Sequence, residues 1–145
     1  MKKLSKKIYW TLSLTWGLFL TLLGLTTALV LLCCGKKPYR HMYGYVFTVG
    51  DSWGGLNLGP IILACKTAQL STLNHEFGHG IQNCYFGPFM PFVVAIPSAV
   101  RYWYREWLVR SGRKKYYELP LYDSIWFEGS ATSIGNAYFD FLENI

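Results

Sequence analysis

Two histidines and a glutamate in the sequence His75-Glu76-Phe77-Gly78-His79 match the pattern H-E-x-x-H. On a helix, histidines at this spacing lie on one face, where both imidazoles can bind one Zn²⁺. The glutamate between them can act as a general base on the water that such a metal activates. Two of the three histidines in the chain lie in this motif. The pattern predicts a zinc site with His75 and His79 as ligands and Glu76 as the catalytic residue.

A catalytic zinc needs a third protein ligand and keeps a fourth position for water. The acidic and thiol side chains that follow the motif are Cys84, Glu106, Glu118, Asp123, Glu128, Asp140 and Glu143. We expect Glu128 to be this ligand, because it begins a predicted helix and shares a face with the small residues Ala131 and Gly135. Asp123 is the alternative, either as a ligand or as a partner that orients a histidine. His41, far upstream, is less favoured.

The motif lies in a segment, from Thr67 to Cys84, that is predicted to be a helix. At 100° per residue its apolar side chains fall on one stripe. This stripe consists of Leu70, Leu73, Phe77, Ile81 and Cys84. His75 lies on the opposite face, among small and polar residues that include Glu76, His79 and Gln82. The apolar stripe can therefore pack while the two histidines remain available to a metal.

The first part of the chain has the pattern of a membrane anchor. Lys2, Lys3, Lys6 and Lys7 precede a run without charges from Ile8 to Gly35. This run is longer than the about 20 residues that a spanning helix needs and than the apolar core of a signal peptide. We predict a retained transmembrane helix in residues 1–35, followed by a zincin-like domain in residues 36–145. The cations flank apolar runs, which favours membrane lipid over nucleic acid as a partner.

The segments around the motif predict a mainly α chain with a small β-hairpin, an α+β fold. Residues 43–49 and 60–64 read as the two strands of the hairpin, and a peptide substrate could add to an edge of either strand. Residues 85–100 contain Pro88, Pro91 and Pro97, which favour a re-entrant or interfacial segment over a regular span. With the aromatic and basic residues that follow, residues 85–107 are expected to associate with a membrane. A final helix is predicted in residues 124–143, with Asp123 or Ser124 as its N-cap.

The distribution of positive charge does not fix the orientation in a membrane. A single span with the N-terminus outside and two spans with the N-terminus inside both place ten Lys and Arg residues inside. A span at residues 85–100 would put His79 and Glu128 at opposite faces of the bilayer, where they could not share a metal without a dipping segment. We therefore expect the site on the cytoplasmic face of the cell membrane, with an intramembrane site as the variant.

The motif followed by a glutamate at the start of a later helix resembles the gluzincins, the thermolysin-like zinc metallopeptidases. The stretches 74–97 and 126–129 look more closely like those of small, largely uncharacterised bacterial membrane proteins with a metallopeptidase site. The resemblance covers roughly residues 44–134 and implies zinc on His75, His79 and Glu128, with Glu76 catalytic. One position departs from it: gluzincins commonly carry an acid where this chain has Thr132. Asp123 or Gln82 could replace that acid.

These observations favour a membrane-bound, zinc-dependent peptidase that hydrolyses extended peptide segments near the membrane. The alternative is a non-catalytic integral membrane protein that keeps a metallopeptidase fold and acts as a binding or adaptor protein. Thr132 and the short chain of 145 residues are the features that favour this alternative. A secreted lytic peptide would require cleavage after the N-terminal run, for which the sequence offers no suitable site.

Overall fold

Five α-helices and four strands make up most of residues 3–144, which are the residues that the computed structural model describes. Two helices come first, α1 (Lys6–Leu14) and α2 (Leu18–Cys33). The four strands follow as β1 (Tyr39–His41), β2 (Gly44–Thr48), β3 (Gly55–Leu58) and β4 (Ile61–Ala64). The remaining helices are α3 (Leu70–Phe86), α4 (Ile96–Arg110) and α5 (Trp126–Glu143). The α+β class expected from the sequence is confirmed.

The strands form one mixed sheet in the order β1-β2-β4-β3. The predicted strands at 43–49 and 60–64 are present as β2 and β4, but they pair in parallel, with Tyr45 opposite Ile61 and Thr48 opposite Ala64. The prediction that they form a hairpin is therefore wrong. The reason is β3, which brings the chain back before β4 and pairs antiparallel with it. Asn57 closes that turn, because its side-chain oxygen accepts a hydrogen bond from the Gly59 N–H, 2.9 Å away.

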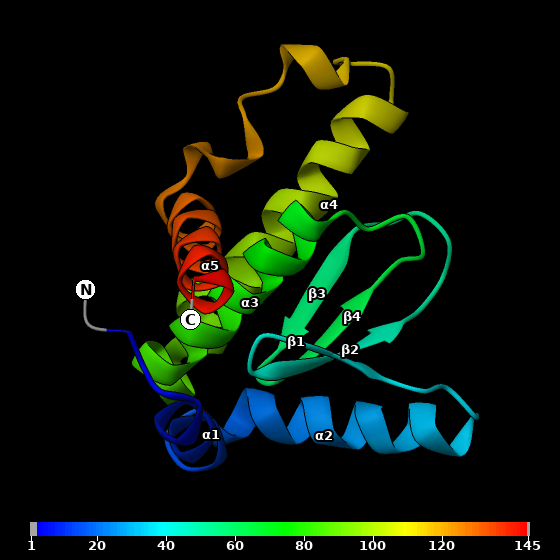
Figure 1. The fold of residues 1–145 in the computed structure, drawn as a ribbon. Coiled ribbons are helices and arrows are strands. Elements are labelled where there is room, and N and C mark those ends of the chain that lie inside the picture. Colours follow the sequence, from blue (N-terminus) through cyan, green and yellow to red (C-terminus); the bar gives the residue numbers. More distant parts are fainter. Residues whose placement is uncertain (1–2, 145) are drawn as a thin grey trace.

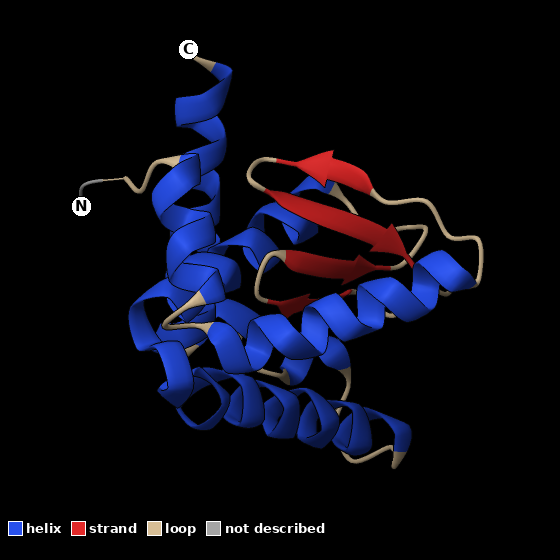
Figure 2. Ribbon diagram, turned by 90° about the horizontal axis from the view of Figure 1, so that it is seen from below, coloured by secondary structure: helices blue, strands red, loops and turns tan. Residues whose placement is uncertain are grey.

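Helices cover both faces of the sheet (Figures 1 and 2). Under one face α2 places Ala28 against Phe47 and Ile61. Against the other face α3 places a larger core, which also includes α1 and α5: Tyr9, Tyr43, Val46, Ile62, Ala64, Leu73, Phe77, Ile81, Cys84 and Tyr138. The predicted apolar stripe of the motif helix thus packs against the sheet, except for the half-exposed Leu70. The two N-terminal helices, α1 and α2, therefore contribute to the same hydrophobic cores as the residues that follow position 35.

The predicted continuous helix from 8 to 35 is broken into α1 and α2, whose axes differ by 95°. Packing explains the break. The Asn83 amide of α3 donates to the Gly17 carbonyl at 3.2 Å, and a Cβ at Gly17 would lie 2.4 Å from the same amide. Within residues 3–144 no single helix is both long and apolar enough to cross a membrane, although two bent helix pairs meet the criteria of length and composition.

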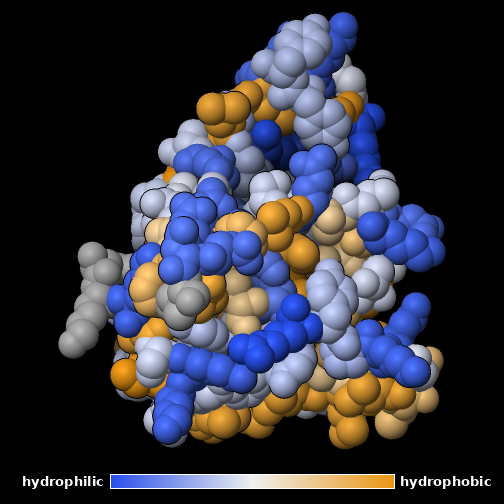
Figure 3. Space-filling model, in the orientation of Figure 1, coloured by the Kyte–Doolittle hydropathy of each residue, from blue (hydrophilic) through white to orange (hydrophobic). Residues whose placement is uncertain are grey.

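The segment after the motif helix turns sharply at Gly87, which has a positive φ of 53°. Short helical turns at Gly87–Phe89 and Pro91–Ala95 lead into α4, and the two arms of this bent pair differ by 116°. The aromatic and basic residues 101–107 extend α4 as regular helix. Many apolar side chains of α2 and α4 remain exposed. Figure 3 shows hydrophobic residues gathered along the lower border of the molecule, over α1 and α2.

The last helix begins at Trp126, after Ile125, which supplies no side-chain cap. The predicted N-cap at Asp123 or Ser124 is therefore wrong. Both residues belong to a short 3₁₀ turn, Tyr122–Ser124. This turn is held by α4, because the Arg101 guanidinium donates hydrogen bonds to the carbonyls of Leu121 and Tyr122 and to the Ser124 hydroxyl. Tertiary contacts thus replace the local cap that the sequence suggested.

Candidate metal centre

Helices α3 and α5 approach so closely that their backbones touch. A Cβ at Gly78 would lie 1.9 Å from the Ala131 carbonyl oxygen, and a Cβ at Gly135 would lie 1.8 Å from the Asn74 carbonyl oxygen. The expectation that small residues around Glu128 permit close packing is confirmed. This contact brings the first turn of α5 beside the middle of α3, so that a carboxylate 49 residues away reaches the two histidines.

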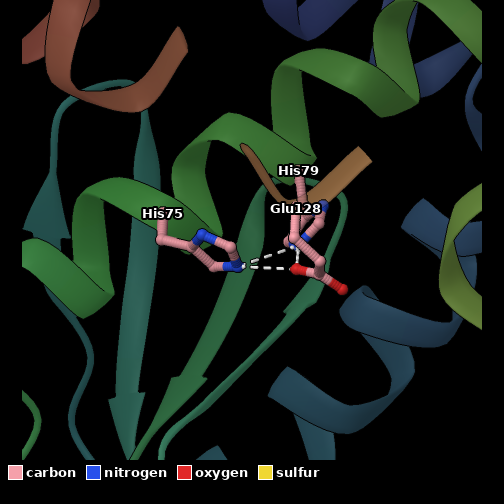
Figure 4. A group of neighbouring side chains, drawn as sticks. All are labelled: His75, His79 and Glu128. Carbon is pink, nitrogen blue, oxygen red and sulfur yellow. Dashed lines mark hydrogen bonds and ion pairs between the residues drawn. The ribbon is translucent and has the colours of Figure 1, made fainter. Parts of the chain in front are cut away.

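Three side chains converge at this contact (Figure 4). The Glu128 Oε2 atom lies 3.1 Å from His75 Nε2 and 3.2 Å from His79 Nε2. The two Nε2 atoms are 3.1 Å apart. Two ligands of a tetrahedral zinc, each bound at about 2.0–2.1 Å, lie about 3.3 Å from one another. The three atoms therefore already stand at nearly the spacing that one metal ion requires.

The hydrogen bonds of Gln82 determine which nitrogen of His79 carries a proton. The Gln82 amide nitrogen donates to the Phe127 carbonyl at 2.8 Å and to the Ser130 hydroxyl at 2.7 Å. The amide oxygen therefore faces His79 Nδ1, at 2.7 Å, and this nitrogen must be the donor. In the neutral imidazole, Nε2 then presents a lone pair to a carboxylate oxygen. Such an arrangement requires a cation or a proton between the two atoms.

The charges around the triad agree with a cation site. Burial raises the pKa of Glu128, but hydrogen bonds from His75 and His79 outweigh it and hold this pKa well below its usual range. Burial lowers the pKa of His79, but the hydrogen bond to Glu128 and the negative charges of Glu76 and Glu128 together outweigh burial and raise this pKa above its ordinary value. Glu128 Oε1 is buried and accepts no well-formed hydrogen bond among the described residues, although the nearby Ser98 hydroxyl also lowers the pKa of this carboxyl. The residues present thus fit a metal ion, whose identity they do not specify.

Glu76 lies beside the triad and against the edge of the sheet. Its side chain is buried, and burial raises the pKa of this carboxyl above its ordinary value. A Cβ at Gly55 of β3 would come within 2.7 Å of Glu76 Cγ. Because Gly55 has no side chain, there is space for the Glu76 side chain between β3 and the two histidines.

A cavity of about 740 Å³ opens onto the triad. His75, Glu76 and His79 lie in its wall, and the Gly55–Asn57 segment of β3 borders them. Much of the remaining wall is apolar and comes from the bent segment and α4, with Leu20 of α2: Met90, Val94, Ala95, Ala99 and Trp103. Glu128, which is completely buried, lies behind the histidines. A peptide-sized ligand would therefore meet the histidines and Glu76 in one apolar chamber.

The other candidates from the sequence are placed elsewhere. Asp123 lies in the cavity wall but is not part of the metal-ligating group found in residues 3–144. The imidazole of His41 forms a hydrogen bond of 3.1 Å with Asn74 and is not part of the metal-ligating group. Cys84 is buried in the main core. None of these three replaces Glu128.

Thr132 and Gln82 orient the two histidines. The Thr132 hydroxyl contacts His75 Nδ1 at 2.8 Å, in the position where the resemblance led us to expect an acid. Gln82, which the sequence offered as a substitute, contacts His79. The sequence did not single out Tyr122, whose ring lies 6.2 Å from that of His75 and whose pKa burial raises to about 12. It also missed Gly55, because no local pattern links β3 to the motif.

The Thr132 contact leads to a first prediction. Thr132→Val keeps the shape of the side chain but removes the hydroxyl that holds His75, so zinc affinity should fall by about 10-fold to 100-fold. Competition with a zinc chelator measures the change. Thr11→Val, at an exposed position of α1, is the matched control and should leave affinity unchanged. Equal affinities for Thr132→Val and the unchanged protein would show that this hydroxyl does not support a metal ligand.

Comparison of the chain with protein-family models, curated proteins and solved structures finds no significant match. The assignment of the site therefore rests on the chemistry and geometry of its own residues.

Proposed function

We propose that the protein is a membrane-bound, zinc-dependent peptidase. The observation that carries the proposal is the convergence of His75 Nε2, His79 Nε2 and Glu128 Oε2 on one point, beside Glu76 and at the wall of a cavity. Three protein ligands with room for a fourth are typical of catalytic zinc sites, whereas structural sites use four. The proposed location is a bacterial cell membrane, with the site on its cytoplasmic face.

In this proposal zinc, when bound, supplies a Lewis acid that polarises a peptide carbonyl and makes water more acidic. Glu76 accepts a proton from the attacking water while the water oxygen bonds to the carbonyl carbon. It then donates that proton to the amine as the carbon–nitrogen bond breaks. A carboxyl group whose pKa is raised by burial is well suited to both steps, because it binds a proton more readily than an exposed glutamate does.

The proposed substrate is an extended peptide segment. We expected it to add to the strands at 43–49 or 60–64, but β2 and β4 are both paired on two sides. The strand with a free edge next to the histidines is β3, and its residues Gly55, Leu56 and Asn57 line the cavity. A peptide that pairs with β3 would use main-chain hydrogen bonds for affinity and would lie across Glu76. The apolar wall opposite β3 favours apolar substrate side chains.

Zinc content tests the metal site. Purified protein is expected to bind one zinc per chain, whereas His79→Ala should bind about 100-fold more weakly or not at all, because two ligands cannot hold a catalytic zinc. Metal analysis after dialysis against a weak chelator measures both. His41→Ala is the matched control, since His41 lies outside the triad. If the unchanged protein binds no zinc, or if His79→Ala binds it equally well, the peptidase proposal fails.

A further inference from the structure

The outer face of α2 has the polarity opposite to that of a helix on the surface of a soluble protein. Its buried side contains Leu20, Thr21, Gly24 and Ala28, which are mostly small or polar. Its exposed side carries large apolar residues, each at least half exposed: Phe19, Leu22, Leu23, Leu29, Val30 and Leu32. Exposed apolar surface of this extent marks an interaction with a membrane or a partner.

The charges around α2 indicate an anionic bilayer. Lys6 and Lys7 lie in α1, before the apolar face, and Lys36 and Lys37 follow it. All four are exposed. The first acidic residue of the chain is Asp51, so residues 1–37 contain no aspartate or glutamate that could neutralise these cations. Clusters of basic residues beside an apolar helix attract anionic lipid headgroups. Trp16, about half exposed at the corner between α1 and α2, is a residue type enriched in that interface.

The packing of α2 determines how it would meet the bilayer. Leu20, Gly24 and Ala28 all lie against the rest of the fold: Leu20 packs with Met90, a Cβ at Gly24 would come 2.2 Å from the Leu58 carbonyl, and Ala28 packs with Phe47. The sheet therefore lies alongside α2 over most of the length of this helix (Figure 1). If α2 crossed the bilayer, the free edges of β1 and β3 would enter the membrane with it. Unpaired backbone groups in contact with lipid are too costly for this arrangement.

We infer that the outer face of α2 binds the surface of an anionic bilayer, with the helix axis parallel to the membrane plane. The leucines enter the boundary between headgroups and acyl chains, and the lysines at both ends contact phosphates. The sheet lies between this face and the larger part of α3. This placement replaces the spanning helix that the sequence suggested. It depends on neither zinc nor catalysis.

Vesicle flotation tests the binding. The full chain, exchanged from detergent, is mixed with vesicles of 70% phosphatidylcholine and 30% phosphatidylglycerol. We expect it to float with them, and the double substitution L22N/L29N to weaken the partition by at least about 10-fold. The control Y117N/L121N removes two exposed apolar residues of the 111–125 connection and should float as the unchanged protein does. Vesicles of phosphatidylcholine alone should bind less, and added salt should weaken binding to the anionic ones.

Depth measurements distinguish a helix that lies flat from one that spans. A bimane label is attached to Leu22→Cys or Leu29→Cys, after replacement of the exposed Cys33 and Cys34 by serine. Quenching by lipids brominated at different acyl positions gives the depth of each label. A flat helix places both labels at the same depth, whereas a spanning helix separates them by about 10 Å. A separation of that size would overturn the inference.

Two other results would also overturn it. One is a folded protein that does not float with anionic vesicles. The other is the formation of a dimer in the absence of vesicles, together with dissociation of that dimer by L22N/L29N. In that case a second copy of the chain would cover the outer face of α2. The circular dichroism spectrum and Tm of each variant, which should equal those of the unchanged protein, show that the fold is retained whether or not zinc is bound.

Discussion

Glu76→Gln is expected to reduce peptide hydrolysis by at least about 100-fold while zinc remains bound. The amide has nearly the shape of the carboxylate, but it cannot accept the proton of the attacking water. Glu76 is not part of the converging group of ligand atoms, which consists of His75, His79 and Glu128, so the metal should stay. Hydrolysis of fluorescein-labelled casein and of a quenched peptide library, together with zinc analysis of the same samples, measures both properties.

The same measurements distinguish the peptidase from the non-catalytic alternative. Glu143→Gln replaces an exposed glutamate at the end of α5 and is the matched control, with unchanged turnover expected. Full activity of Glu76→Gln would contradict the role given to this carboxyl. A chain that binds one zinc, but cleaves neither the casein nor any member of the library, would favour a binding or adaptor protein that retains the metal site.

Gly135→Ala is expected to destabilise the fold by about 3 kcal/mol and to weaken zinc binding at the same time. The added methyl group would lie 1.8 Å from the Asn74 carbonyl, a backbone atom that cannot rotate away. Relief of this clash requires α5 to move from α3, and Glu128 moves with it. For a chain of this size the loss corresponds to a decrease in Tm of about 10 °C. Thermal unfolding monitored by circular dichroism, together with a zinc titration, measures both effects.

A matched control on the same helix is Ser133→Ala. Ser133 is exposed on α5, so this substitution changes neither the contact with α3 nor the propensity of the helix by much, and Tm should stay within about 2 °C. If Gly135→Ala has the same Tm and zinc affinity as the unchanged protein, the helices are not held at the distance that the site needs.

The local sequence was sufficient to predict the motif helix and its apolar stripe, because periodicity and side-chain type act within one element. His75, His79 and Glu76 were identified in this way, and small residues around Glu128 correctly indicated a close contact with another helix. The strands at 43–49 and 60–64 were also located. Their parallel pairing was not, because the direction of β4 depends on β3, a short strand of mixed polarity that has no strong pattern of its own.

The sequence by itself determined the chemistry that this protein can offer: two imidazoles and a carboxyl on one helix, a later glutamate with small neighbours, and an apolar arm with cations at its ends. Tertiary structure decided how these parts are used. The close contact at Gly78 and Gly135 brings Glu128 to the histidines, Thr132 and Gln82 orient the two rings, and contacts at Gly17 bend the arm along the sheet. These outcomes depend on atoms that are far apart in the chain, so their physical cause lies in packing between elements, which no local pattern records.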